Sequence, residues 1–343
     1  MTKTNSSFFV PLIITSVRKS RRPIDAFMMM MAPEYYTFTG RANEVIPRHV
    51  THVLIDKALK SVTVRAFWCH PNIQEVICHD GVEKIEGFAF YKCYSLRRVI
   101  MPGVKVINRY AFEQCGALTY IECGKLETIG DRAFQICESL RSIQLPSIKI
   151  IERWAFNHCC INMANVKFGK ELESIREGAF WGCTSLERIA LPLKDGMVID
   201  DTTFQMCEKL NHVDLVEGAV LHETIAALLM EEWKNDMNAE IDSINQNLAS
   251  ARAGTGRIGD VGEKAQAIRT WITSVLRKIT HYKAEHRRIL SEATAILQPA
   301  LPNDILFKNV LPFLELPSFT FDGEDYGIPQ LVTHIPALSI NDL

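Results

Sequence analysis

The stretch of sequence that decides the fold reads Ile129-Gly130-Asp131-Arg132-Ala133-Phe134-Gln135-Ile136-Cys137-Glu138-Ser139-Leu140. Its framework, Ala-Phe-x-x-Cys-x-x-Leu, recurs seven times with few substitutions, at intervals of 22 to 24 residues. The seven steps are Ala66-Phe67, Ala89-Phe90, Ala111-Phe112, Ala133-Phe134, Ala155-Phe156, Ala179-Phe180 and Thr203-Phe204. A fixed period of this length indicates a stacked repeat array, because one short unit cannot bury its apolar face alone.

Two apolar runs in each repeat predict the two walls of a solenoid. The first run ends in Leu-x-x-Ile or Leu-x-x-Val and alternates apolar with polar residues, as a half-buried strand does. These runs are Leu96–Met101, Leu118–Cys123, Leu140–Leu145, Met163–Phe168, Leu186–Leu191 and Leu210–Leu215. Stacked about 4.8 Å apart, they would form a parallel sheet along one face.

The second apolar run precedes each Ala-Phe step. A branched apolar residue lies four positions before each Ala or Thr, at Val62, Ile85, Ile107, Ile129, Ile151, Ile175 and Ile199. We expect this run to supply the opposite wall, and the Phe of every repeat to join a continuous aromatic spine in the core. The small residue before each Phe would let successive turns approach closely.

The repeat unit resembles the BspA-type leucine-rich repeat, whose pattern I-G-x-x-A-F-x-x-C-x-S-L the quoted stretch follows closely. The flanking segments Val45–Val53 and Ile279–His286 are similar to flanks in large expanded families of single-celled eukaryotes. The repeat resemblance covers roughly half of the 343 residues. It implies a leucine-rich repeat solenoid of about seven repeats that serves as an adhesion or interaction scaffold, without naming a ligand.

Composition and periodicity divide the chain into five segments. We expect a basic, disordered leader or targeting segment (1–33), an N-terminal cap (34–61), a leucine-rich repeat solenoid (62–221), a helical hairpin or coiled coil (222–298) and a short apolar segment with a disordered acidic tail (299–343). The cap is needed because the open end of a solenoid exposes unpaired strand edges.

After the repeats, the apolar period changes to that of amphipathic helices. One stripe runs through residues 223–249 and a second, near heptad spacing, through residues 263–297. Such a helical pair has three alternatives: docking on the last repeat, folding on itself, or forming a homodimer through residues 223–297. A glycine-rich connector, Ala251–Gly262, is expected to be a flexible linker.

The ten cysteines lie between Cys69 and Cys207, and six of them follow the repeat period. No Cys-x-x-Cys pair occurs, so a structural zinc site is not expected. His70 takes the rung position in the first repeat. We predict small, buried, reduced thiols that fill a narrow core position, as cysteine does when it packs like a small hydrophobe.

Composition limits the partners and leaves the compartment open. A net charge of −2 argues against a general nucleic-acid binder, and no apolar run of 18 residues predicts a membrane span. Reduced cysteines favour an intracellular, cytoplasmic location. The basic start of the chain leaves an organelle transit peptide, a nuclear import signal at 18–22 and a secretory signal at 8–14 as alternatives, with translation starting at Met1 or within Met28–Met31.

No sequence motif predicts an enzyme or a cofactor. Gly254–Gly259 matches the dinucleotide pattern G-x-G-x-x-G, but that site needs a strand before its glycines, and a helical pattern precedes them here. His281–His286 resembles a metalloprotease box with one extra residue, which moves the two histidines off a shared helix face. Signatures of serine nucleophiles, phosphate-binding loops and kinases are absent.

The candidate binding residues are those that alternation turns outward on the first wall. We call them the sheet-face row: Glu75, Ile77, Arg98, Ile100, Tyr120, Glu122, Ser142, Gln144, Asn165, Lys167, Arg188, Ala190, His212 and Asp214. The row varies between repeats and includes Tyr120 and the cations Arg98, Lys167 and Arg188, a composition found at binding hot spots. We predict a non-enzymatic scaffold that binds a protein or peptide here; the alternative is a structural protein that dimerises through its C-terminal helices.

Overall fold

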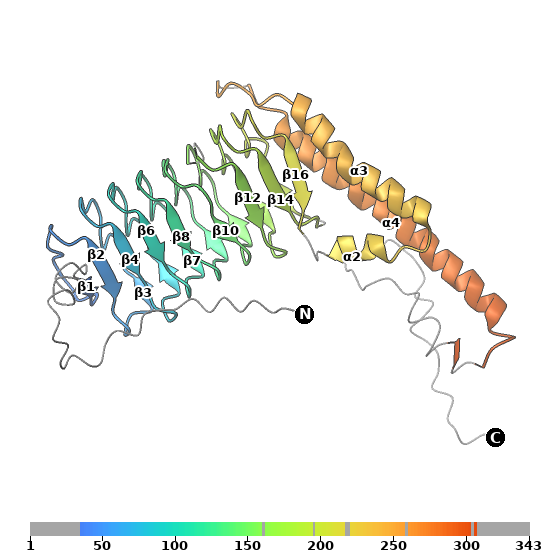
Figure 1. The fold of residues 1–343 in the computed structure, drawn as a ribbon, viewed down its shortest axis with the longest axis horizontal. Helices are drawn as coiled ribbons and strands as arrows, with labels where there is room; N and C mark the ends of the chain where they lie inside the picture. The colour runs from blue at the N-terminus through green and yellow to red at the C-terminus, as the bar shows by residue number, and fades with distance from the viewer. Residues whose placement is uncertain are drawn as a thin grey trace, which may run out of the picture.

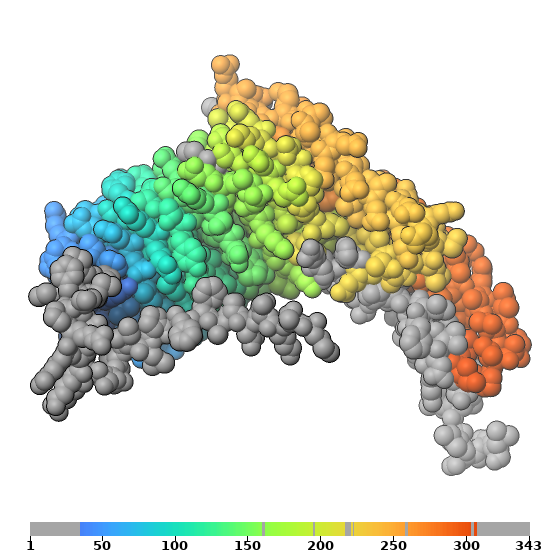
Figure 2. Space-filling model, viewed as in Figure 1, coloured from blue at the N-terminus to red at the C-terminus, as the bar shows by residue number. Residues whose placement is uncertain are grey.

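Short strands stack into a solenoid that ends against a helical hairpin (Figure 1). The computed structural model describes residues 35–159, 162–194, 196–216, 220–257, 260–302 and 305–306. The predicted leader (1–33) and most of the predicted tail (299–343) lie outside these residues. The solenoid and the hairpin form one continuous surface that bends where they meet (Figure 2). The predicted fold class is confirmed.

The first wall consists of parallel strands in two neighbouring sheets. One sheet contains β1 (Tyr35–Phe38), β2 (His52–Ile55), β4 (Glu75–Ile77), β6 (Arg98–Ile100) and β8 (Tyr120–Glu122). The other contains β10 (Gln144–Leu145), β12 (Asn165–Phe168), β14 (Arg188–Leu191) and β16 (His212–Leu215). Within each of the two sheets, every strand is in register with the next, so equivalent residues form rows along the solenoid.

The second wall is one parallel sheet of seven two-residue strands. They are β3 (Ser61–Val62), β5 (Lys84–Ile85), β7 (Val106–Ile107), β9 (Thr128–Ile129), β11 (Ile150–Ile151), β13 (Ser174–Ile175) and β15 (Val198–Ile199). The second residue of every strand is the branched apolar residue that precedes an Ala-Phe step, and all seven are buried. The apolar period therefore sets the register of this wall.

The predicted aromatic spine fills the space between the walls. Phe67, Phe90, Phe112, Phe134 and Phe156 stack with ring centres 4.9–5.3 Å apart and nearly parallel planes, and Phe180 and Phe204 continue the stack. None of the seven rings is more than 1% exposed. Because each ring is covered by the rings of its neighbours, no repeat can complete its core alone.

The Ala-Phe turns form a third side, where backbone N–H groups bond to the next repeat. The amides of Arg65, Phe67 and Cys69, for example, donate to the carbonyls of Gly87, Ala89 and Tyr91. This geometry puts two positions of most turns in the left-handed backbone region. The residue before the Ala occupies it in six repeats: Arg65, Phe88, Tyr110, Arg132, Trp154 and Gly178, with φ of 54° to 60°.

The core cysteines donate hydrogen bonds across the repeats. The thiols of Cys93, Cys115 and Cys137 each lie 3.0–3.1 Å from a carbonyl of the preceding repeat. His70 takes the equivalent place in the first repeat, with Nε2 3.1 Å from the Pro47 carbonyl. Burial raises the pKa of the Cys93 thiol to about 12. None of the nine described cysteines forms a disulfide, and eight of them are buried; Cys160 lies outside the described residues.

A row of charges alternates in sign just before the strands of the second wall. We call it the charge ladder: Lys60, Glu83, Lys105, Glu127, Lys149 and Glu173. Lys105 pairs with Glu83 at 3.7 Å, and Lys149 with Glu127 at 2.9 Å. The hydrogen bond from Lys149 lowers the pKa of Glu127, and Lys105 adds to that effect. Each of the four inner charges therefore lies between neighbours of opposite sign.

The C-terminal helices are α2 (Val220–Ala226), α3 (Glu231–Ser250) and α4 (Lys264–Leu297). The single helix expected over 223–249 is thus divided. The break at 227–230 contains no Gly or Pro, so local sequence did not predict it. Leu228, inside the break, is 2% exposed against the core, which indicates that packing decides the conformation there.

The hairpin folds on itself and docks on the last repeat. The indole Nε1 of Trp271 on α4 donates to the Glu240 carbonyl on α3 at 3.0 Å. The amide of Val213 on β16 donates to Asn245 Oδ1 on α3 at 2.9 Å, so α3 covers the open edge of the sheet. The buried Lys264 amine donates to the carbonyls of Leu210 and Leu248, joining the last repeat to both helices.

The connector between the helices is held against the solenoid, so the expectation of a flexible linker was wrong for its described residues. Gln205 in the last turn donates to the Asp260 carbonyl at 2.6 Å and accepts from the Gly262 amide at 2.7 Å. The Met206 amide donates to the Ala253 carbonyl at 2.7 Å. These long-range contacts have no signature in the local sequence.

Candidate functional site

Except for Ala190, the structure places the sheet-face row on the outer side of the first wall, as alternation predicted. Val76, Val99 and Ile121 point into the core, whereas their neighbours on β4, β6 and β8 are partly or fully exposed. Register brings Glu75 beside Arg98 and Arg98 beside Tyr120, although these residues are more than 20 positions apart in sequence. Ala190 is buried, at 8% exposure, near the hairpin.

At the N-terminal end, four side chains of the first wall form one cluster. The Tyr35 hydroxyl donates to Glu75 at 2.6 Å, and Arg98 pairs with the same carboxylate at 3.2 Å. The Arg98 guanidinium lies over the Tyr120 ring, 4.9 Å from its centre. Burial, with the hydrogen bond to Glu75, raises the pKa of Tyr35 to about 12. The cluster is therefore fixed before any ligand arrives.

At the C-terminal end, Arg188 and His212 share the carboxylate of Asp214. Arg188 Nη1 lies 2.8 Å from both carboxylate oxygens of Asp214. His212 Nε2 lies 3.1 Å from Oδ1 of the same residue. The three side chains come from adjacent strands, β14 and β16, so register alone brings them together.

These ion pairs change the electrostatic expectation for the row. Of the three cations that the sequence places there, Arg98 and Arg188 are neutralised by Glu75 and Asp214. Lys167 forms no ion pair within the described residues. The row is therefore a surface of mixed and largely balanced charge, in which two of the three cations are already paired.

The middle of the row is less regular than its ends. No strand pairing joins β8 to β10, and β10 is only two residues long. Gln144 lies on this short strand, while Ser142 lies outside any strand. The Cys123 thiol, 3.7 Å from the Gln144 carbonyl, bridges the interruption. Both row residues are exposed there.

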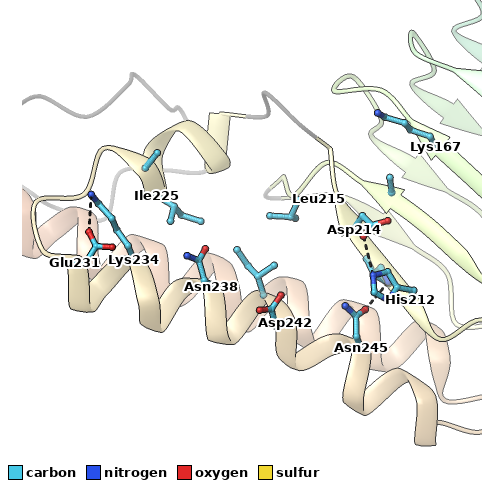
Figure 3. A pocket seen from close by; sticks show the side chains of 14 residues that line it. Lys167, His212, Asp214, Leu215, Ile225, Glu231, Lys234, Asn238, Asp242 and Asn245 are labelled. Carbon is cyan, nitrogen blue, oxygen red and sulfur yellow. Dashed lines mark hydrogen bonds and ion pairs between the residues drawn. The ribbon is translucent and has the colours of Figure 1, made fainter.

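The row runs into a cavity of about 760 Å³ where the solenoid meets the hairpin (Figure 3). We call it the junction cavity. It is lined from the solenoid by Lys167, Ala190, His212, Val213, Asp214 and Leu215, and from α2 and α3 by Ile225, Ala226, Glu231, Lys234, Asn238, Ile241, Asp242 and Asn245. Both walls mix polar with apolar groups.

The sequence analysis missed the helical half of this cavity. A signal was present, because Glu231, Lys234, Asn238, Asp242 and Asn245 recur at helical spacing as a polar stripe. The stripe faces the sheet-face row only because α3 docks on the last repeat. Lys234 pairs with Glu231 at 3.4 Å, whereas Asp242 forms no ion pair within the described residues.

Chemistry at a metal centre has no support in the described residues. No group of three or more His, Cys, Asp or Glu side chains there could hold a metal ion. His281 and Tyr282, from the predicted helical box, have tilted rings 5.4 Å apart, and Tyr282 donates to Asp236 at 2.6 Å. Of the helices the structure describes, none is both long and apolar enough to cross a bilayer.

The stacked walls, the phenylalanine spine and the exposed row define a repeat-solenoid class of protein. Six copies of the BspA type leucine rich repeat region match residues 48–141 and 105–224, which together span just over half of the chain. The chain belongs to the BspA-type leucine-rich repeat family. Proteins of this family generally act as interaction modules that bind other proteins and generally lack enzymatic activity.

Solved structures of leucine-rich repeat proteins are similar to the chain. One from T. pallidum is 30% identical, covers 41% of this chain and 68% of its own, and has a TM-score of 0.37. One from Eubacterium ventriosum is 14% identical, with coverage of 48% and 73% and a TM-score of 0.34. A leucine-rich cell surface protein from Faecalibacterium prausnitzii is 19% identical, with coverage of 53% and 90% and a TM-score of 0.22. No curated protein matches the chain.

Proposed function

We propose that this protein is a non-enzymatic binding module whose sheet-face row holds an extended segment of a partner protein or peptide, with one end of that segment in the junction cavity. The observation that carries the proposal is the continuity of the row with the cavity. Lys167, His212 and Asp214 belong to both. A segment that follows the row, across the strands, would therefore end against α3.

The preorganised ends of the row support the same proposal. Arg98 is held by Glu75 and Tyr120, and Arg188 by Asp214, so these side chains lose little freedom when a partner binds. Because the pairs are balanced, we expect a ligand of mixed polar and apolar character. Lys167 and Asp242, the two lining charges without ion pairs within the described residues, would contact opposite charges of the ligand.

Filling the cavity tests the proposal. A displayed library of random 12-residue peptides, selected on the folded protein, supplies the probes, and fluorescence anisotropy measures their affinity. Asn238→Trp introduces a large side chain into the cavity wall, whereas Asn247→Trp introduces the same side chain at an exposed position of α3 outside it. We expect Asn238→Trp to weaken binding at least tenfold and Asn247→Trp to leave it within twofold. Equal affinities for both variants would contradict the proposal.

Dimerisation through residues 223–297 has no comparable support. The first half of the apolar stripe of α4, including Ile268, Val275 and Ile279, is buried within the chain, whereas Ile296 near its end is 75% exposed. On this proposal the protein is a monomer by light scattering. The cytoplasmic location, the absence of nucleic-acid partners and the likeness of the flanks to families of single-celled eukaryotes remain predictions.

A further inference from the structure

The Ala-Phe turns present a second surface, which we call the turn face. It carries the side chains of the one or two residues before each Ala and after each Phe, from Arg65 to Trp181. Trp68 is 53% exposed there. The sheet-face row lies on a different wall of the solenoid, so the turn face is independent of the proposed binding site.

Large side chains occupy strained backbone positions on this face. Phe88, Tyr110 and Trp154 have φ of 58° to 60°, a region that costs a residue with a Cβ about 1–2 kcal/mol relative to right-handed backbone. The sixth repeat has Gly178 at the equivalent position, with φ of 58°, so glycine satisfies the same turn. Strain kept in several successive repeats indicates a role for these side chains beyond folding.

The side chains stack into one continuous array. The Phe88 and Tyr110 rings are nearly parallel, with centres 4.8 Å apart. The Arg65 guanidinium lies 5.5 Å from the Phe88 ring centre, and that of Arg109 lies 6.0 Å from it. Arg132 lies over Tyr110 at 5.5 Å and donates to its hydroxyl at 2.9 Å. Cations and rings therefore hold one another in place.

Three cations on the turn face lack the ion pairs found elsewhere. Arg65, Lys92 and Arg109 form none within the described residues, in contrast to Arg98 and Arg188 on the sheet-face row. The acidic groups nearby balance them only in part. Asp131 pairs with Arg132 at 3.0 Å. Burial raises the pKa of the Glu113 carboxyl group, although the charges of Arg132 and Lys92 act to lower it.

We propose that the turn face from Arg65 to Arg132 is a second docking surface, which holds an acidic segment of a partner protein. A guanidinium fixed flat on a ring keeps its N–H edge free to donate to a carboxylate and loses little entropy on binding. Nucleic acid fits less well, because it binds such surfaces by stacking bases on free ring faces. Here the faces of Phe88 and Tyr110 are already covered by each other and by arginines.

The left-handed backbone offers a selective test. Arg65 and Lys92 have φ of 57° and 58°, a region that asparagine adopts at low cost, so Arg65→Asn with Lys92→Asn removes two cations while relaxing the turns. The control, Lys125→Asn with Lys170→Asn, removes two exposed cations away from the turn face. The probes are peptides selected on the wild-type protein from a random 12-residue display library, and a dT15 oligonucleotide.

We expect the selection to yield peptides rich in Asp and Glu. Their affinity should fall at least tenfold on the Arg65/Lys92 variant and stay within twofold on the control, while the denaturation midpoint of the Arg65/Lys92 variant is not lowered. The proposal would be overturned if the selected peptides lacked acidic residues, or if their affinity fell equally on both variants. Tight binding of dT15 that requires Arg65 and Lys92 would also overturn it. Acidic peptides that lose affinity on Asn238→Trp but not on the Arg65/Lys92 variant would overturn it as well, while leaving the sheet-face proposal intact.

Discussion

Phe112→Ala is the substitution that tests the architecture most directly. Phe112 is fully buried, and its ring stacks on Phe90 at 5.0 Å and on Phe134 at 5.2 Å. Truncating a buried phenylalanine costs about 3–5 kcal/mol. Each stacked ring pair adds about 0.5–1.5 kcal/mol beyond the effect of buried area. The cost of Phe112→Ala should therefore lie in the upper half of the range for truncation. For an m-value of about 3 kcal/mol/M, the urea midpoint should fall by about 1 M or more.

The control for this prediction is Gln144→Ala on the exposed row, which should change stability by about 0.5 kcal/mol or less. Circular dichroism follows the strands, and the fluorescence of the five tryptophans reports on both solenoid and hairpin. If the repeats form one cooperative unit, both probes should shift together in Phe112→Ala. Equal midpoints for the two variants, or a loss confined to one probe, would refute the reasoning.

Three further predictions follow from buried polar groups. Burial lowers the pKa of His70 in the folded protein. The unfolded chain therefore binds a proton at His70 more readily, and the protein loses stability as pH falls below about 6.5. His70→Gln should remove that part of the pH dependence of the denaturation midpoint. Lys264→Met leaves the carbonyls of Leu210 and Leu248 without their donor and should cost about 1–3 kcal/mol, whereas the exposed Lys209→Met should cost little in the same urea titration. Among the nine described thiols, Cys69 alone is exposed and should react with a maleimide reagent in the native protein, while the other eight should need denaturant; rapid labelling of most of them would contradict their burial.

The sequence predicted the features that depend on the repeat period. The regular spacing of Phe112 and its equivalents was enough to predict the aromatic spine. The alternation of polar and apolar residues around Val99 and Ile121 was enough to predict that the row faces outward. The ion pair between Arg98 and Glu75 was also within reach, because residues one period apart must face each other in a parallel sheet. Sequence analysis missed it by treating the row as separate charges.

Features that depend on how separate segments meet could not be predicted in this way. The junction cavity exists because α3 docks beside β16, and the contacts that fix this docking, such as Val213 to Asn245, join residues with no periodic relation. The left-handed backbone of the Ala-Phe turns could be predicted only in part from the sequence. Gly178 and Gly182, at positions where the other repeats have bulky residues, already indicated a left-handed backbone there.

The charge ladder has a consequence for how this array can change length. Repeat proteins gain and lose whole units, and losing one unit of 22 to 24 residues would leave the spine and both walls continuous. It would, however, place like charges on adjacent repeats, for example Lys60 beside Lys105, where like charges directly opposite are destabilising. Losing two neighbouring units would restore the alternation. The alternation of charge is therefore preserved only when repeats are lost or gained in pairs. Variants of this array that differ from it by an even number of repeats should be more stable than variants that differ by an odd number.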